Sequence, residues 1–278
     1  MKLKAKLPPN RTYEQVLNHY TVEKAIAQRL KRADREERKK IYATMYDELF
    51  KNVPDHPRLI ERDTNKNRRP SQDKTFRIVR NFITSNSVFL EFAPGDCSFA
   101  RFMCGYVKQV YAVDIAEQRG SNSETPSNFN LIIYNGYDLD LPPEETDTIF
   151  SDQFIEHLHS EDVQYHLQLA NTLLKQGGTY IFKTPHAFFG PWDVSLFFSD
   201  TAEGFHLKEW TFTELERVVK ASGFSSCVGY WRMIKNYAPV PLIYFKAVES
   251  VIGMFPHTMK KLISRYFIPR HIVMICKK

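Results

Sequence analysis

The middle of the chain alternates between short apolar runs and segments with helical periodicity, and this alternation restricts the possible folds more than any other feature. The runs predicted to be strands are residues 87–92, 109–115, 130–135, 147–154, 179–185 and 225–231, and the predicted helices between them are 97–106, 159–178 and 211–224. Strands that are apolar throughout are typical of a parallel sheet covered by helices on both faces. Ligands of such sheets bind at the carboxyl ends of the strands, where polar residues cluster in this sequence.

Helical segments flank this alternating region on both sides. Residues 12–50 have helical spacing, the prolines of VPDHP (53–57) end it, and 71–83 is predicted to be a helix with Ser71 as its N-cap. After residue 231 we expect two further helices and a last strand, at 241–255, 257–267 and 271–278. The predicted organisation is therefore an N-terminal helical extension that caps the substrate, a core, and a C-terminal unit, with bounds 1–70, 71–230 and 231–278.

Charge is distributed unevenly along the chain. Residues 1–80 hold 21 Lys and Arg against 11 Asp and Glu, residues 81–230 hold 8 against 20, and residues 231–278 hold 9 against 1. Solvated helix faces account for such a pattern. An equally good explanation is that the two basic ends meet over one face and attract an anionic substrate, a nucleic acid or a membrane surface.

Targeting and redox signals are few in this sequence. No apolar run reaches about 18 residues, and the basic N-terminus lacks the apolar stretch of a signal peptide. The four cysteines have no CxxC spacing, so we expect small buried residues and neither a disulfide framework nor a zinc site. These features predict a cytoplasmic protein.

The loop after the first predicted strand limits the kinds of ligand that can bind there. In VFLEFAPGDCSFARFM (88–103), an apolar run that contains Glu91 is followed by a loop with a single glycine, Gly95. A dinucleotide fingerprint needs G-x-G-x-x-G and a P-loop needs GK[ST], and neither pattern is present. Asp96 also adds a negative charge beside the place where phosphates would lie. The loop therefore favours a ligand without phosphate.

The segment E-F-A-P-G-D-C resembles the first motif of class I S-adenosylmethionine-dependent methyltransferases, an acid followed by a G-x-G-x-G loop. Ala93 and Cys97 stand at two of the glycine positions. NGYDLDLP (135–142) is similar to the family's adenine-flanking segment, and SDQFIEHLHSEDV followed by LLKQGGTYIFKTP is similar to its fourth strand, helix and fifth strand. The resemblance covers about 71–230 and the last strand. It implies a Rossmann-like doubly wound α/β sheet of seven mostly parallel strands, with the last strand antiparallel.

The resemblance also implies a cofactor, S-adenosyl-L-methionine, which leaves as S-adenosyl-L-homocysteine. The carboxylates of the acidic middle region favour its sulfonium and ammonium groups. Asp114 ends the second strand, 19 residues after Gly95, where a carboxylate can accept both ribose hydroxyls. The residues that the resemblance implies for cofactor binding are Glu91, Ala93, Gly95, Asp114, Ile115, Asn135, Gly136, Asp152 and Gln153.

Acid and histidine side chains after the fourth and fifth strands are the candidates for catalysis. Methyl transfer from a sulfonium needs a positioned nucleophile and, for a hydroxyl, removal of its proton, for which histidine is suited. We therefore predict an O-methyltransferase in which His157 or His206 is the general base, with Glu156 beside them. N-methylation, which needs less help from a base, is the alternative.

The E-H-L and H-x-x-E-W-T segments resemble two subgroups of the family. One is the ubiquinone-pathway O-methyltransferases, and the other is the small-RNA 2′-O-methyltransferases, which hold a divalent metal with Glu-x-x-Glu-His and a later His. Glu156, His157 and His206 match that pattern, but Gln153 replaces its first Glu, and an amide is a poorer ligand for a hard cation. The prediction is therefore that no metal is bound, with a metal-dependent RNA 2′-O-methyltransferase as the alternative.

Aromatic residues predict where the acceptor binds. Tyr42, Tyr46, Phe50 and the stretch 185–198 are expected to form a lid from the N-terminal helices and the insert after the fifth strand. With the basic ends beside it, this lid favours a small-molecule or saccharide acceptor, particularly an anionic one. RNA is less favoured, because no RNA-binding module is visible.

The sequence is also compatible with two roles outside catalysis. A protein with this fold can lose catalysis and serve only as a binding partner. The apolar C-terminal helices with their basic rim also allow contact with a membrane surface, although packing against the core is the preferred prediction.

Overall fold

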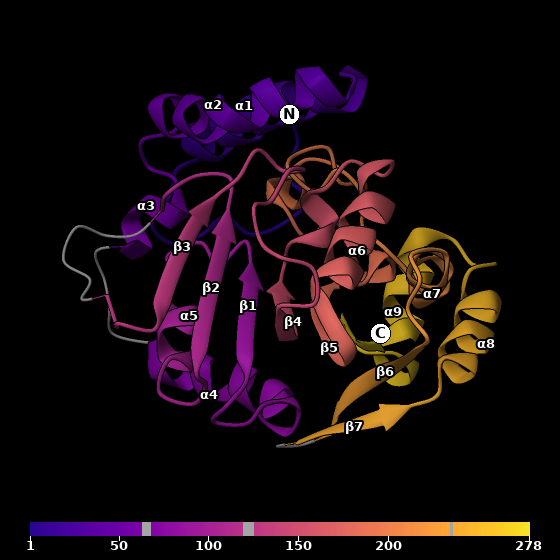
Figure 1. The fold of residues 1–278 in the computed structure, drawn as a ribbon. Coiled ribbons are helices and arrows are strands. Elements are labelled where there is room, and N and C mark those ends of the chain that lie inside the picture. The colour runs from indigo at the N-terminus through magenta and orange to yellow at the C-terminus, as the bar shows by residue number, and fades with distance from the viewer. Residues whose placement is uncertain (63–67, 119–124, 234–235) are drawn as a thin grey trace.

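One eight-stranded sheet organises the chain in this computed structural model, which describes residues 1–62, 68–118, 125–233 and 236–278 (Figure 1). The strand order is β3-β2-β1-β4-β5-β8-β6-β7. The strands are β1 (Val88–Phe92), β2 (Gln109–Asp114), β3 (Phe129–Ile133), β4 (Thr146–Asp152), β5 (Leu174–Pro185), β6 (Ser226–Met233), β7 (Asn236–Val240) and β8 (His271–Lys277).

The sheet is parallel from β3 to β5 and antiparallel beyond it. β8 pairs antiparallel with both β5 and β6, and β7 pairs antiparallel with β6. The Rossmann-like α/β fold with an antiparallel last strand is confirmed, but the number of strands is eight among the described residues, because β7 was not predicted. Pro239 obscures it in the sequence, and a proline is tolerated because β7 lies at the edge of the sheet.

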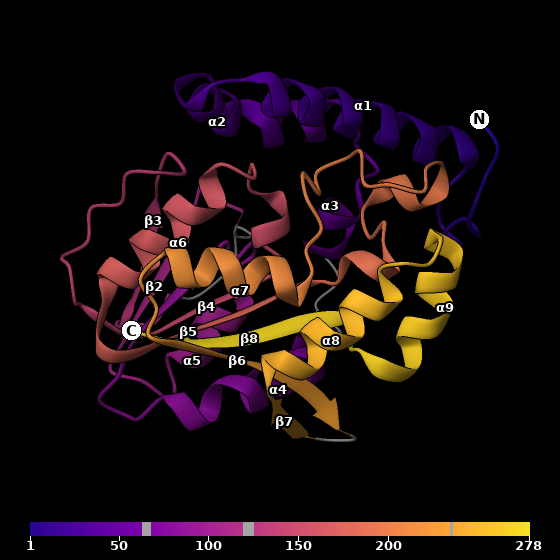
Figure 2. The same ribbon diagram turned by 90° about the vertical axis from the view of Figure 1, so that its right-hand side faces the viewer.

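Helices cover both faces of the sheet, as the continuous apolar strands predicted (Figure 2). On one face, α4 (Arg68–Val79) and α5 (Ser98–Met103) bury a cluster that includes Phe89 and Phe150. On the other face, α6 (Asp162–Leu173), α7 (Phe212–Ala221) and α8 (Leu242–Ile252) bury a second cluster around Phe92 and Phe212. α9 (His257–Phe267) follows α8 and leads into β8.

Three helix boundaries differ from their predictions. The run 12–50 divides into α1 (Tyr13–Arg32) and α2 (Arg35–Asn52), because Asp34 forms a capping box with Glu37 and starts a new helix. α4 begins at Arg68, so Ser71 lies inside it and is not its N-cap. α6 ends at Leu173 instead of continuing to 178, because Leu174 already pairs with Thr146 of β4.

The N-terminal helices lie over the carboxyl ends of the parallel strands (Figure 1). They include α3 (Pro57–Arg62), and they contact residues 186–211, which form the insert after β5. The Lys4 amide donates to the Phe197 carbonyl at 2.9 Å, and the rings of Tyr20 and Phe198 pack at 5.0 Å. The two segments predicted to form a lid are therefore in contact with each other.

Candidate active site

A pocket of about 290 Å³ lies at the carboxyl ends of β1, β2 and β4, below α2. Its walls come from six parts of the chain: aromatic residues of α2, Arg58 of α3, the loop after β1, the end of β2 with the segment that follows it, the segment after β3, and the segment after β4. This is the position at which open α/β sheets bind ligands, because the loops that follow neighbouring parallel strands diverge there. Residues that line it include Tyr42, Tyr46, Arg58, Gly95, Asp114 and His157.

The loop after β1 contains only one glycine but has the backbone conformation of a glycine-rich loop. Ala93, Gly95 and Cys97 all have left-handed φ angles, of 52°, 55° and 59°. Such a conformation costs a non-glycine residue about 1–2 kcal/mol. Ala93 and Cys97 therefore bear a conformational cost that glycine would avoid, and the loop still leaves room for a ligand beside Gly95.

Carboxylates converge behind this loop. Glu91 is 5% exposed, and its Oε2 has no hydrogen-bond partner within the described chain. Burial raises the pKa of Glu91 well above its ordinary value, and the neighbouring charges of Asp152, Asp96 and Asp114 raise it further. Adding a cation would relieve both the burial penalty and this repulsion. The site is thus suited to a positively charged ligand.

Asp114 lines the pocket at the end of β2. Its Oδ1 accepts from the Ile115 amide at 2.7 Å and its Oδ2 accepts from the Gly95 amide at 3.3 Å. Burial raises the pKa of this carboxyl to about 6, against the lowering effect of those amides. An ionised carboxylate has about four acceptor positions, so it keeps capacity for ligand hydroxyls.

This shifted pKa predicts a pH dependence of cofactor binding. A hydroxyl donor favours the ionised form of Asp114, so we expect the affinity for S-adenosylhomocysteine to fall as pH decreases below about 6 and to be constant above it. Calorimetric titrations between about pH 5 and 8 measure this. Asp114→Asn should bind more weakly and should lose most of the pH dependence. A wild-type affinity that does not change over this range would contradict the expectation.

His157 closes a short 3-10 turn, Ile155–His157, after β4 and lines the pocket. Its Nδ1 lies 2.9 Å from the carbonyl oxygen of Phe205. A carbonyl only accepts, so Nδ1 carries the proton and Nε2 of the neutral ring keeps its lone pair. Burial, followed by the nearby His206, lowers the pKa of His157 to about 3. The ring is therefore neutral near pH 7 and can accept a proton at Nε2.

His206 and Glu156 lie next to His157. The two imidazole rings are 5.0 Å apart, and His206 Nδ1 donates to Glu209 Oε1 at 2.9 Å. Burial alone would lower the pKa of His206, but the hydrogen bond to Glu209 and the charges of Glu156 and Asp193 outweigh it, so this pKa is raised. Burial raises the pKa of Glu156 to about 7. Three titratable side chains with different protonation preferences therefore meet beside the pocket.

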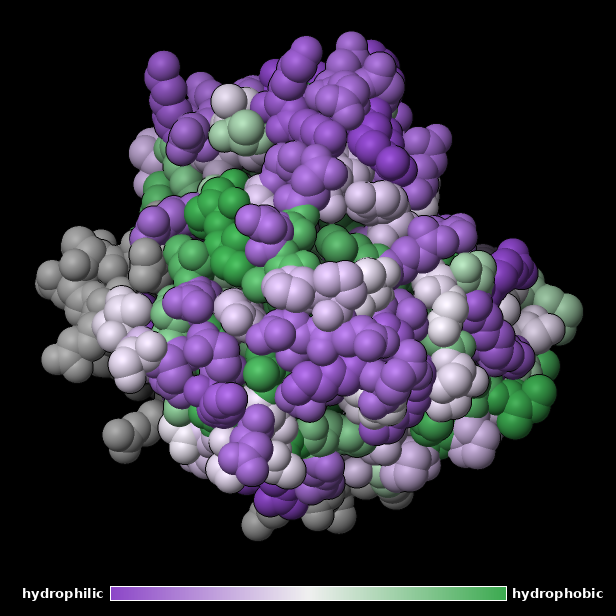
Figure 3. Space-filling model, viewed as in Figure 1, coloured by the Kyte–Doolittle hydropathy of each residue, from purple (hydrophilic) through white to green (hydrophobic). Residues whose placement is uncertain are grey.

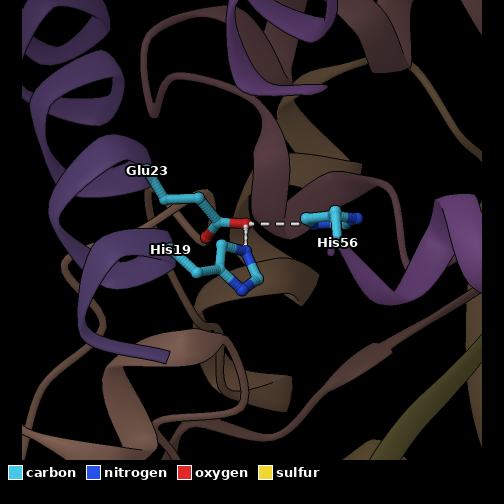
Figure 4. A group of neighbouring side chains, drawn as sticks. All are labelled: His19, Glu23 and His56. Carbon is cyan, nitrogen blue, oxygen red and sulfur yellow. Dashed lines mark hydrogen bonds and ion pairs between the residues drawn. The ribbon is translucent and has the colours of Figure 1, made fainter. Parts of the chain in front are cut away.

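A second buried cluster, which we call the Glu23 cluster (His19, Glu23 and His56), connects the N-terminal helices to the insert (Figure 4). Arg11 donates to His19 Nδ1 at 2.8 Å, so the proton of His19 lies on Nε2, which donates to Glu23 Oε1 at 2.8 Å. In the same way, the Arg58 amide donates to His56 Nδ1, and His56 Nε2 faces Glu23 at 3.8 Å. Because both Nε2 atoms carry protons, this cluster is a hydrogen-bonded network and lacks the free lone pairs that a metal needs.

The Glu23 cluster also reaches the candidate base. The second carboxylate oxygen of Glu23 accepts from the Phe205 amide at 3.3 Å, and the carbonyl of the same Phe205 accepts from His157. Glu23 of α1 thereby holds Phe205, whose carbonyl determines the tautomer of His157. Neither link was visible in the sequence, because the three partners are separated by more than 40 residues.

The structure brings most of the predicted site residues together. The pocket wall includes Ala93, Gly95, Asp114, Ile115, Gly136, Asp152, Gln153 and His157. Glu91 is buried beneath the loop, and Glu156 and His206 are buried beside His157. Asn135 is not part of the wall, since its side-chain oxygen accepts from the amides of Tyr137 and Asp138.

Two contributions to the site were not predicted. Arg58 lines the pocket and contacts Tyr46, with its Nη1 3.3 Å from the tyrosine hydroxyl. It follows the VPDHP stretch, where no periodic pattern marks it. Glu209 accepts a hydrogen bond from His206 Nδ1 and so orients the ring.

Comparison with known proteins supports the assignment that the fold and pocket suggest. Residues 90–182 match a family model described as a methyltransferase domain. A crystal structure of an S-adenosylmethionine-dependent methyltransferase from Archaeoglobus fulgidus has a TM-score of 0.54 and 17% identity, covering 79% of this chain and 98% of that one. Phosphoethanolamine N-methyltransferase 1 from Haemonchus contortus, solved with phosphoethanolamine and S-adenosylhomocysteine, has a TM-score of 0.53 and 12% identity, covering 88% and 50%. No curated protein matches the sequence.

The strand order, the loop after β1 and the matched domain define a Rossmann-like methyltransferase fold. Residues 90–182 carry a methyltransferase domain, and the fold is similar to that of S-adenosylmethionine-dependent methyltransferases of known structure. The cofactor that this similarity indicates is S-adenosylmethionine. The structure suits that cofactor, because the carboxylates around Glu91 face a pocket that a sulfonium cation can occupy. When bound, the cofactor supplies an activated methyl group.

Proposed function

We propose that the chain transfers a methyl group to a hydroxyl oxygen of a small-molecule or saccharide acceptor, with His157 as the general base. The observation that carries the proposal is the tautomer of His157, whose Nδ1 is committed to the Phe205 carbonyl while the ring lines the pocket. Its Nε2 lone pair can therefore take the hydroxyl proton as the oxygen attacks the methyl group. His206 lies beside it, 5.0 Å from ring to ring, and its charge, after burial, lowers the pKa of His157.

The lining of the pocket supports an acceptor that carries negative charge. Arg58 is the one Arg or Lys side chain in the pocket wall among the described residues, and it lies against Tyr46. Tyr42 and Tyr46 add aromatic surface on which a sugar or phenol ring can pack. A guanidinium binds carboxylate and phosphate groups through paired hydrogen bonds. An anionic saccharide or phenol is thus the preferred acceptor class.

A panel of matched acceptors tests this proposal. The purified protein is incubated with methyl-labelled S-adenosylmethionine and with sugars and phenols, each with and without a carboxylate or phosphate, together with the corresponding amines and a short RNA. We expect label on the oxygen of anionic hydroxyl compounds. Label only on the amines would establish N-methylation, and label only on the ribose 2′-oxygen of RNA would replace the proposed acceptor class.

A second candidate mechanism has its own structural support. Glu156 Oε1 is buried and has no hydrogen-bond partner among the residues that the structure describes, and both His157 and His206 direct Nδ1 to other acceptors. The ligand atoms of these three residues lie within 4.8 Å of one another. Two imidazoles and one carboxylate are ligands that divalent transition metals accept. A metal held there would lower the pKa of an acceptor hydroxyl, and the histidines would then be ligands instead of bases.

Chelation distinguishes the two mechanisms. If His157 acts as the base, dialysis against a chelator should leave turnover unchanged to within about twofold, since no metal takes part. If the three residues hold a metal, turnover should fall at least tenfold and return when Mn²⁺, Zn²⁺ or Mg²⁺ is added. S-adenosylhomocysteine binding, measured in parallel, shows that the chelator has not damaged the cofactor site.

A further inference from the structure

The outer surface of α8 and α9 is unusually apolar. Several large apolar side chains there are exposed, among them Ile243 at 69%, Met254 at 77% and Tyr266 at 74%. The others are Tyr244, Val251, Met259, Leu262 and Phe267. We call this set of eight residues the α8–α9 patch. Its α8 part is visible as hydrophobic surface at the lower right of Figure 3, where α8 lies in Figure 1. Clusters of this kind usually mark interaction sites.

The patch does not arise because the helices fail to pack. Leu242, Phe245 and Ile252 of α8 are buried against the core. Ile243 and Val251 point outward from the same helix, so α8 has apolar residues on two sides. On α9, Met259, Leu262 and Tyr266 recur at spacings of three and four residues and form one exposed stripe. The predicted packing against the core therefore uses only one side of the helix pair.

Positive charge surrounds this stripe. From Ser250 to Lys278 the sequence contains six Lys and Arg and no Asp or Glu. Lys261, Arg265 and Arg270 are exposed, and Lys260 is half-buried. Interface cores between proteins are poor in charged residues, whereas apolar residues mixed with Lys and Arg are typical of helices that lie on anionic lipid.

We propose that the α8–α9 patch binds the surface of an anionic phospholipid membrane. Met259, Leu262 and Tyr266 insert among the acyl chains near the headgroups, while Lys261 and Arg265 contact lipid phosphates. Within the described parts of the chain, no helix combines the length and apolar character needed to cross a membrane. The contact that we propose is peripheral, with the helices lying along the surface.

A hydrogen bond at the start of α9 connects the α8–α9 patch to the insert after β5. His257, at the start of α9, donates from Nε2 to the Gly190 carbonyl at 3.1 Å. Gly190 belongs to the insert that also carries His206. Membrane binding would thus hold the insert at a fixed distance from the lipid surface. Because the patch is already formed in the folded chain, binding would not need to order a flexible segment and would avoid that entropic cost.

Co-sedimentation with vesicles tests the proposal on the full-length chain. The vesicles contain phosphatidylcholine with about one-third phosphatidylserine, or phosphatidylcholine alone. We expect binding to the anionic vesicles that weakens with added salt. Lys261→Gln with Arg265→Gln should weaken it roughly 25-fold, because each cation near such a surface contributes about a fivefold factor. The matched control pair, Arg32→Gln with Lys51→Gln, removes exposed cations from α1 and α2 and should bind as wild type.

A second pair tests the apolar contribution. Leu262→Ser with Tyr266→Ser should reduce vesicle binding at least tenfold, whereas Ile133→Ser with Tyr106→Ser, exposed elsewhere, should not. S-adenosylhomocysteine binding by each variant verifies that the fold is retained. Absence of vesicle binding by the wild type, or equal losses in test and control pairs, would overturn the proposal. A wild-type dimer that Leu262→Ser with Tyr266→Ser dissociates, without any vesicle binding, would also overturn it and identify a protein interface.

Discussion

Asp114→Ala is expected to weaken S-adenosylhomocysteine binding at least a hundredfold. The carboxylate lies at the end of β2, lines the pocket and holds the Gly95 amide of the loop after β1. Hydrogen bonds to a charged group each contribute about 1.5–3 kcal/mol, and the substitution removes the carboxylate that we expect to accept both ribose hydroxyls. Calorimetric titration of protein freed of co-purified ligand measures the change. NADH, titrated for comparison, should not bind.

Asp140→Ala serves as the matched control, since Asp140 is an exposed aspartate in the loop after β3. It should leave the affinity within about twofold of wild type, as most exposed substitutions have small effects. Thermal unfolding of both variants separates loss of binding from loss of fold. Wild-type affinity in a folded Asp114→Ala protein would mean that the cofactor does not use this side chain.

Replacing both His157 and His206 by alanine should lower turnover roughly a hundredfold or more while cofactor affinity changes little. A general base typically raises the rate by about 10²–10⁴-fold. Cofactor affinity should change little, because the carboxylates that suit the cofactor are other residues than these two histidines. The His157→Ala single variant should account for most of the loss, because His157 lines the pocket and His206 does not. Single-turnover rates with saturating S-adenosylmethionine measure the chemical step.

His159→Ala is the control, because His159 lies two residues away and is not part of the pocket wall. Full activity in the double variant would remove both histidines from the mechanism, whether as bases or as metal ligands. A loss of activity together with a large loss of cofactor affinity would show that these side chains support the pocket and would leave the base unidentified.

Most of the core was predictable because its signals are local. β1, with every residue buried, reads as an apolar run, and Thr211 with Glu214 marks the start of α7 as a capping box. β7 was missed because Pro239 argues against a strand unless the strand is known to lie at an edge. The break at Asp34 was missed because helical spacing continues on both sides of it.

The site was predictable in its parts and not in its connections. Asp114 and His157 could be selected because they follow strands whose carboxyl ends meet. The tautomer of His157 depends on a carbonyl 48 residues away, and the support of Phe205 depends on Glu23, 182 residues away. The left-handed backbone at Ala93 and Cys97 was indicated only by the resemblance, which places both at glycine positions, since neither residue type favours that conformation. The two long-range contacts follow from tertiary packing.

The position of Glu23 has a consequence for the order of events in a catalytic cycle. One carboxylate joins α1, His56 and the amide of Phe205, and Phe205 in turn orients His157. Any movement that lifts the N-terminal helices from the insert would break the contact between Glu23 and the Phe205 amide. If His157 is the base, as proposed, admission of the acceptor beneath the N-terminal helices would be linked to the support of the residue that orients it.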